Sequence, residues 1–240
     1  MTASLTLTAL EGLPEITIDH DLPALLAEAV PAGDGILVVA QKIVSKYEGR
    51  LVDLKQVKPS ERAQELARQV DKDPRQIEVI LGETARVVRA VPGVVICETH
   101  HGLVCANAGV DLSNSPGDDI AILLPVDPDA SAETLRAALG PGRGVVISDT
   151  FGRPWREGLV DTAIGVAGFS PLRDMNESGD RRGRELQVTI MALADQLAAA
   201  AGILMEKSAG IPAVWVEGVP IEGTGTLSDL IRNPSTDLFR

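Results

Sequence analysis

Residues 144–158 read GVVISDTFGRPWREG, and this stretch carries the main signals for fold and site together. Its first five residues, 144–148, are mostly aliphatic and predict a buried strand, because the covered strands of α/β proteins are near-continuous runs of Val, Ile and Leu. The strand delivers Asp149 and Thr150 at its carboxyl end, where open α/β sheets place their ligand sites. Arg153 and Arg156 follow a few residues later. We therefore expect an α/β protein whose functional site lies at this strand end.

The segments on either side alternate strand and helix signals. Buried strands are predicted at 36–40, which runs into the segment 41–46, and at 213–217, and a short extended segment is predicted at 15–18. Ser60 and Asp73 are expected to be N-caps, since short polar side chains accept hydrogen bonds from the first helical amides. The predicted helices are 21–30, one from Ser60 to 70, one beginning at Asp73, 131–139 and an Ala-rich helix at 188–205. The polar insert 173–184 is the best candidate for a mobile loop.

The middle of the chain is rich in strand signals, at 86–90, 94–98 and 103–106. No covering helix is evident close by in the sequence, and exposed strand edges favour association. Pairing across a two-fold axis would bury both copies of this region at once, which predicts a homodimer. The alternative is a monomer in which the helix at 188–205 covers these strands.

The composition narrows the function. The net charge of −12 argues against a nucleic-acid partner and against docking on an anionic membrane surface. Hydrophobic residues make up 45% of the chain and aromatic residues 2%, so the core is aliphatic. The sequence shows no signal peptide and no membrane span, and its two cysteines cannot form a disulfide framework. We expect a single domain over 1–240 in a soluble, cytoplasmic protein.

Two further polar clusters could bind ligands. Asp111 lies in a polar loop after the strand at 103–106, and together with Asp149 and Thr150 it would offer the oxygen ligands that Mg²⁺ or Mn²⁺ prefers. A lysine in 41–46 could contact a nucleotide phosphate as a point charge. The alternatives are ordinary turns held by Asp and Asn side chains, and solvated surface lysines.

Two other patterns are discounted. Residues 202–208 resemble a phosphate-binding loop, but they lack the Gly before Lys207 and they end a helix where such a loop would begin one. The set Cys97, His100, His101 and Cys105 lacks the paired Cys-x-x-Cys spacing of a structural zinc site, so zinc is disfavoured.

Taken together, these segments resemble the coenzyme F420-0:γ-glutamyl ligase family. The resemblance extends over essentially the whole chain and is most specific at 104–114 and 148–158. The matching stretches are GLPEI at 12–16, VVAQKIVSKYEGR at 38–50, ETHHGLVCANAGVDLSN at 98–114, LLPVDPDASA at 123–132 and ISDTFGRPWREGLVDTAIGVAG at 147–168.

The resemblance implies mixed sheets with flanking helices, an intertwined homodimer and a ligase reaction. Family members use GTP, two divalent cations (Mg²⁺ or Mn²⁺) and K⁺ to join L-glutamate to F420-0, and then add γ-linked glutamates. By resemblance, the expected metal ligands are Asp111, Asp149 and Thr150, and the expected GTP contacts are Leu13, Pro14, Glu15, Ile16, Gln41, Lys46 and Asn114. Arg153 and Arg156 are expected to contact substrate or phosphate.

The chain also departs from the family. Where members often have a Gly-rich turn, it has Met205 and Glu206, which leaves Glu206 as the nearest candidate for a further metal ligand. The C-terminal flavin-binding domain of some bacterial members is expected to be absent. No side chain is an obvious general base. A metal-dependent phosphohydrolase and a non-catalytic nucleotide-binding subunit remain alternatives, since either could use the same side chains.

Overall fold

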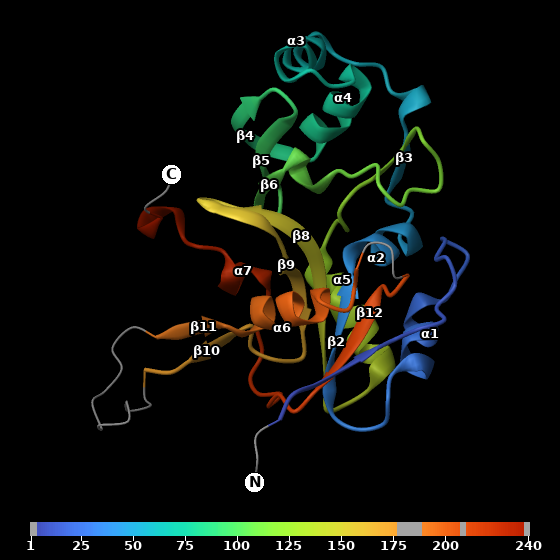
Figure 1. Ribbon diagram of the computed structural model, residues 1–240, viewed down its shortest axis with the longest axis vertical. Helices are drawn as coiled ribbons and strands as arrows, with labels where there is room; N and C mark the ends of the chain where they lie inside the picture. Colours follow the sequence, from blue (N-terminus) through green and yellow to red (C-terminus); the bar gives the residue numbers. More distant parts are fainter. Residues whose placement is uncertain (1–3, 177–188, 207–209, 238–240) are drawn as a thin grey trace.

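The computed structural model describes residues 4–176, 189–206 and 210–237. Figure 1 shows a larger part, built on a five-stranded sheet, and a smaller part at the top that contains α3, α4 and a three-stranded sheet. The strands are β1 (Thr6–Ala9), β2 (Gly35–Ala40), β3 (Leu51–Asp53), β4 (Thr84–Val91), β5 (Val94–Thr99), β6 (Val104–Ala106), β7 (Ile120–Ile122), β8 (Arg143–Arg153), β9 (Arg156–Ala167), β10 (Leu172–Asp174), β11 (Ile190–Ala192) and β12 (Ala213–Glu217). The helices are α1 (Leu22–Ala29), α2 (Gln41–Tyr47), α3 (Glu61–Val70), α4 (Pro74–Gly82), α5 (Pro128–Leu139), α6 (Leu193–Gly202) and α7 (Leu227–Leu230), with short 3₁₀ turns at Leu54–Gln56, Asn107–Gly109 and Pro234–Thr236.

The main sheet has the strand order β1-β12-β2-β8-β9. Only β2 and β8 run parallel, and every other neighbouring pair is antiparallel. Helices α1 and α5 cover one face through a core that includes Leu26 and Leu135, and α6 covers the other face through Leu197 and Ala201. The sheet is thus buried on both faces, as the continuous aliphatic runs at 36–40 and 213–217 predict, and the mixed α/β class is confirmed.

Gly35 allows two neighbouring strands of the main sheet to pack closely. A Cβ atom at Gly35 would lie 2.4 Å from the indole ring of Trp215 on the neighbouring strand β12. Trp215 is fully buried, and the guanidinium of Arg143 lies 5.6 Å from the centre of its ring. The absent side chain at Gly35 therefore makes room for the only tryptophan in the core.

Both predicted N-caps of the smaller part are confirmed. Ser60 Oγ accepts a hydrogen bond from the amide of Ala63 at 3.2 Å, and Asp73 Oδ1 accepts one from the amide of Arg75 at 2.8 Å. Helices α3 and α4 pack on one face of the β4-β5-β6 sheet through a shared core, which includes Ala63, Ala67, Val70, Ile77, Ile80, Val95 and Cys97. The expectation that no nearby helix covers these strands is therefore wrong, and the cover is not the Ala-rich helix α6.

The largest difference from the sequence prediction is the length of β8. The strand continues past Ser148 to Arg153 and turns back through Pro154 and Trp155 into β9, so Asp149 and Thr150 lie inside a long hairpin. Trp155 takes the left-handed backbone conformation, with φ 57°, at this turn. Gly, Pro and charged residues are poor strand formers, and they concealed the second half of the hairpin.

Three smaller predictions also change. Residues 15–18 are irregular, and the strand of the N-terminal segment is instead β1, at the edge of the sheet beside β12. The Ala-rich helix is shorter than expected, because α6 begins at Leu193 directly after strand β11. Most of the insert 173–184, and Val188 at the predicted helix start, lie outside the described residues.

Candidate functional site

The site lies where two parallel strands end at different heights. Strand β2 pairs with β8 only as far as Ala40 and Ser148, and then the chain turns into α2 at Gln41. Strand β8 continues to Arg153, paired with β9 on its other side. The β8 edge from Asp149 onward therefore projects above the carboxyl end of β2, where α/β sheets bind their ligands.

A pocket of about 740 Å³ occupies this position. All seven side chains expected to contact GTP line it, and so do Asp149, Thr150 and Glu206. Among the described residues, the lining comprises Leu13, Pro14, Glu15, Ile16, Ala40, Gln41, Lys42, Ile43, Lys46, Asn114, Ser115, Pro116, Ser148, Asp149, Thr150, Asp161, Met205, Glu206, Gly210, Ile211 and Pro212. Segments far apart in the chain thus form one cavity.

Three of the expected residues lie outside this lining. Asp111 does not line the cavity, but its carboxylate forms an ion pair with Lys42, which does. Arg153 and Arg156 lie at the tip of the β8–β9 hairpin, where Arg153 Nη2 donates to the carbonyl of Glu157 at 2.8 Å. The structure therefore brings the expected GTP contacts together with two expected metal ligands, and it leaves both arginines away from the pocket of their own chain.

One wall of the pocket presents donors. Lys46 is buried, and its Nζ donates to the carboxylate of Glu15, which joins α2 to the segment after β1. The side chain of Gln41 is also buried; its Oε1 accepts from Ser45 Oγ at 2.8 Å, while its Nε2 has no hydrogen-bond partner among the described residues. A buried donor without an acceptor is uncommon in folded proteins. An acceptor-rich ligand such as a nucleotide would satisfy it.

The lining also contains an acidic group of residues around Asp149. Burial raises the pKa of Asp149 to about 7, Lys42 partly opposes the rise, and the neighbouring charges of Asp111 and Asp161 reinforce it. A carboxylate withdrawn from water next to other carboxylates is stabilised in its charged form by a cation. The surroundings of Asp149 therefore fit a site for a positive charge.

Lys42 supplies one such charge. Its Nζ lies 2.7 Å from Asp111 Oδ2, 2.7 Å from Ser113 Oγ and 3.0 Å from the Ser113 carbonyl oxygen. Burial pushes the pKa of Asp111 upward, but hydrogen bonds from Lys42 and Ser113 together hold it below its ordinary value. The ammonium group thus occupies a position, surrounded by oxygens, of the kind a metal cation takes.

Asp161 is a pocket residue that the sequence interpretation missed. It lies on β9 directly opposite Thr150, and its Oδ1 accepts a hydrogen bond from Thr150 Oγ1 at 2.6 Å. A simple two-residue hairpin around Pro154 and Trp155 would place Leu159 opposite Thr150. The irregularity between Gly152 and Arg153 moves the register by two residues and brings Asp161 there instead. Sequence alone carried no signal for this shift.

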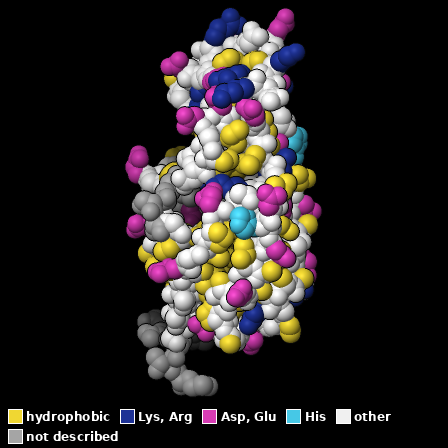
Figure 2. Space-filling model, turned by 90° about the vertical axis from the view of Figure 1, so that its right-hand side faces the viewer, with side chains coloured by type: hydrophobic (Ala, Val, Ile, Leu, Met, Phe, Trp, Pro, Cys, Tyr) yellow, Lys and Arg dark blue, Asp and Glu magenta, His cyan; other side chains and the backbone are white. Residues whose placement is uncertain are grey.

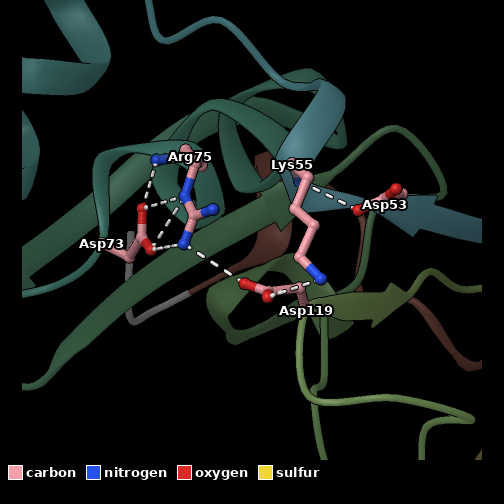
Figure 3. Close-up of polar contacts among 5 residues, drawn as sticks. All are labelled: Asp53, Lys55, Asp73, Arg75 and Asp119. Atoms are coloured by element: carbon pink, nitrogen blue, oxygen red, sulfur yellow. Dashed lines mark hydrogen bonds and ion pairs between the residues drawn. The ribbon is translucent and has the colours of Figure 1, made fainter.

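The loop that carries Asn114 is anchored to the smaller part by ion pairs (Figure 3). The carboxylate of Asp119, at the end of this loop, forms ion pairs with Arg75 Nη2 at 3.3 Å and with Lys55 Nζ at 3.4 Å. Arg75 also forms an ion pair with Asp73, the N-cap of α4, in which Arg75 Nη2 lies 2.6 Å from Asp73 Oδ2. The backbone amide of Lys55 donates a hydrogen bond to Asp53 Oδ1 at 2.9 Å. One wall of the pocket is therefore tied to α4 and to the turn after β3.

The zinc interpretation gains no support from the geometry. His100 Nε2 contacts the carbonyl oxygen of Gly82 at 3.2 Å, and His101 Nε2 contacts that of Pro125 at 3.0 Å. Cys97 and Cys105 face each other across β5 and β6 as buried free thiols. Within residues 4–176, 189–206 and 210–237, no three His, Cys, Asp or Glu side chains form a group that could hold a metal by themselves.

The surface charge and the helix lengths can be compared with the predictions of no nucleic-acid partner and no membrane span. On the face shown in Figure 2, Lys and Arg side chains lie among Asp and Glu and form no continuous basic strip over the described residues. Within the described part of the chain, no helix is both long enough and apolar enough to cross a bilayer.

Comparison with known proteins gives a consistent result. The family model described as F420-0:Gamma-glutamyl ligase matches residues 12–218. The coenzyme F420:L-glutamate ligase of Methanothermobacter thermautotrophicus is 43% identical over 250 residues, covering 98% of this chain and 99% of the relative. The enzymes of the same name from Methanopyrus kandleri and Archaeoglobus fulgidus are 46% and 40% identical, and the alignments cover 95% and 96% of this chain and 99% and 94% of the relatives. The match spans every described segment that lines the pocket, and the chain therefore belongs to the F420-0:gamma-glutamyl ligase family.

Proposed function

We propose that this chain is a coenzyme F420:L-glutamate ligase that uses GTP and divalent cations to join L-glutamate to F420-0 and then to add γ-linked glutamates. The observation that carries the proposal is the pocket itself. Its lining combines the Gln41 amide, which has no hydrogen-bond partner among the described residues, and the buried ammonium of Lys46 with the acidic edge at Asp149 and Thr150. Family membership supplies the identity of the substrates.

In this proposal GTP enters between the segment 13–16 and the loop at Asn114. Lys46 would leave Glu15 for a phosphate oxygen, and because the Glu15 side chain is 75% exposed, water can replace the lost contact. Gln41 Nε2 would donate to an acceptor on the nucleotide. Lys42 lies within the same lining and offers a second positive charge for the phosphates.

Asp149 and Thr150, with Asp111 behind Lys42, are the proposed ligands of divalent cations. The raised pKa of Asp149 and the oxygen donors around Lys42 Nζ support this assignment. Mg²⁺ is commonly held by one or two carboxylates together with substrate phosphates, so a site that lacks a complete protein cage fits the ion. When bound, the cations would neutralise charge on the transferred phosphoryl group.

The chemistry needs an activated carboxylate, because a free carboxylate is a poor electrophile. Transfer of the γ-phosphoryl group of GTP to the carboxylate of F420-0 releases GDP and gives an acyl phosphate. The glutamate amine then attacks the acyl carbon, and phosphate and a proton leave as the amide forms. Phosphoryl transfer depends mainly on positioning and charge neutralisation. In this chain those tasks fall to Lys42, Lys46 and the Asp149–Thr150 edge. Arg153 and Arg156 remain proposed substrate contacts only if the hairpin tip reaches a second subunit.

The test is the coupling between phosphate release and the two acceptor substrates. The enzyme with GTP, Mn²⁺ and K⁺ should release phosphate only when F420-0 and L-glutamate are both present, and mass spectrometry should show F420-0 gaining glutamate. Phosphate release without either acceptor would instead identify a phosphohydrolase. Tight GTP binding with no turnover would identify a binding subunit.

We also propose a homodimer. Helices α3 and α4 cover one face of the β4-β5-β6 sheet, but Val104 on β6 points away from that core and is 45% exposed. A second copy would bury this face, as a self-complementary two-fold interface does. Sedimentation equilibrium of the wild type and of Val104→Glu tests it, with Val126→Glu as a control at another exposed valine. A wild-type mass near 25.3 kDa with full activity rules the dimer out.

A further inference from the structure

Asp161 is held in one orientation by contacts from two sides. On the β8 side, its Oδ1 accepts the Thr150 hydroxyl proton at 2.6 Å. On the α6 side, a Cβ atom built on Gly202 would lie 2.6 Å from Asp161 Oδ2 and 2.9 Å from its Cγ. The last residue of α6 is thus a glycine whose missing side chain makes room for this carboxylate.

The position is electrostatically unfavourable for a carboxylate. The C-terminal end of a helix carries partial negative charge, and Asp161 lies against the end of α6. Its charge also contributes to the raised pKa of Asp149. No Lys or Arg among the described residues forms an ion pair with it. Asp161 is thus a half-buried carboxylate that lies beside other negative charge and is held by the Thr150 hydroxyl.

The hydrogen bond determines where Thr150 can direct its oxygen. A threonine hydroxyl has one proton and two lone pairs, and its rotation is otherwise free to suit any neighbour. Once the proton points toward Asp161 on β9, the lone pairs of Thr150 Oγ1 point away from β9. Both residues line the pocket, so these lone pairs become available to a ligand there.

We propose that Asp161 is a positioning residue for the ligase reaction, which fixes the Thr150 hydroxyl so that its lone pairs face the cation of the bound nucleotide complex. The inference rests on the proposed function, since it needs Thr150 to act as a cation ligand. It assigns a role to a carboxylate that the family resemblance did not single out. Removal of a residue that hydrogen-bonds to a metal ligand typically lowers metal affinity by about 10- to 100-fold.

The experiment measures Mn²⁺ binding in the presence of GTP and without F420-0, so that no ligation occurs. Electron paramagnetic resonance of free Mn²⁺ gives the affinity. Asp161→Ala should weaken binding by roughly tenfold or more. Asp161→Asn keeps a carbonyl oxygen that can accept the same proton, and it should remain within about threefold of the wild type. An equal loss in both variants would overturn the inference, because charge rather than the hydrogen bond would then be the cause.

A double-mutant cycle with Thr150→Val makes the test specific. If Asp161 acts through Thr150, Asp161→Ala should add almost nothing once the hydroxyl has been removed. Independent, multiplicative losses would overturn the inference. If Asp161→Ala does not fold, Gly202→Ala serves in its place: it leaves Asp161 in the chain but displaces its carboxylate, and unchanged Mn²⁺ affinity in that variant would count against the proposal.

Failure of the proposed function gives a different result. A wild-type protein that binds no Mn²⁺ with GTP would overturn both the proposed function and the inference. A wild type that binds Mn²⁺ while all Asp161 and Gly202 variants match it overturns the inference alone.

Discussion

The Nζ atom of Lys42 lies 2.7 Å from Oδ2 of Asp111, so the first turn of α2 neutralises a carboxylate from the loop after β6. Asp111 in turn contributes to the raised pKa of Asp149. The acidic side of the pocket therefore contains a lysine that competes with any cation for the same oxygens.

Replacing this lysine should make metal binding tighter. In Lys42→Met without nucleotide, Mn²⁺ affinity should rise by roughly fivefold, since a partly exposed ion pair contributes about 1 kcal/mol or less. Titration with Mn²⁺ followed by paramagnetic resonance measures it. Lys55→Met is the matched control, because Lys55 also pairs with an aspartate, Asp119, but lies outside the pocket lining. Weaker Mn²⁺ binding in Lys42→Met would contradict the competition.

Asp149→Asn should abolish turnover and leave the protein folded. The substitution removes the charge that a divalent cation needs. The loss of activity should therefore exceed the roughly 100-fold effect that is typical when a residue hydrogen-bonded to a metal ligand is removed. It also removes a carboxyl group whose pKa burial raises to about 7, so thermal unfolding should occur at the same temperature or higher in metal-free buffer. Normal activity at saturating Mn²⁺ would exclude Asp149 as a ligand.

Lys46→Ala should weaken GTP binding by about 1.5–3 kcal/mol, the range for hydrogen bonds to charged groups. Glutamate affinity should change little. Isothermal calorimetry measures both, and Arg62→Ala, which removes an exposed charge on α3, is the control. Glu15→Gln should not weaken GTP binding, because it releases the Lys46 ammonium from its partner. Unchanged GTP affinity in Lys46→Ala would return this lysine to a purely structural role.

Asp195 predicts a pH dependence of stability. Burial raises its pKa, although the Ala163 amide donates to its Oδ1 at 2.9 Å and opposes the shift. Because the folded protein holds this proton more tightly than the unfolded chain, stability falls as the pH rises from the ordinary carboxyl value of about 4 through the raised pKa. Asp195→Asn, which keeps an acceptor oxygen, should therefore gain stability over the wild type as the pH increases through this window. Urea unfolding at several pH values measures the difference in unfolding free energy between the variant and the wild type, with the exposed Asp19→Asn as control. A difference that stays constant with pH would contradict the prediction.

Local signals predicted much of the fold. Ser60 and Asp73 cap helices through contacts within three residues, and the buried strands at 36–40 and 213–217 are continuous aliphatic runs. Such features depend on neighbours in the sequence. The resemblance added the residues expected to contact the nucleotide, and all of these line the pocket.

Contacts between segments far apart in the sequence could not be predicted from it. The register of the β8–β9 hairpin depends on an irregularity beside Gly152, so the meeting of Thr150 and Asp161 had no local pattern. The edge strand β1 is short and alternates in exposure, and it becomes a strand because β12 offers it a partner. The cover of β4-β5-β6 by α3 and α4 likewise depends on three-dimensional packing.

The pairing of β1 with β12 joins the N-terminal segment to a strand formed about 200 residues later in the sequence, as residues 6–9 and 213–217 lie side by side in the main sheet. The segment 13–16 follows β1 and the segment 210–212 precedes β12, so this pairing brings two walls of the pocket together. The amide of Leu10, just after β1, also donates to the carbonyl of Ala213 at 2.9 Å. A chain growing on the ribosome has made Lys46, Asp149 and Asp161 long before β12 exists. The proposed nucleotide site can therefore be completed only after β12 has been synthesised, and chains that still lack this strand would bind no GTP there.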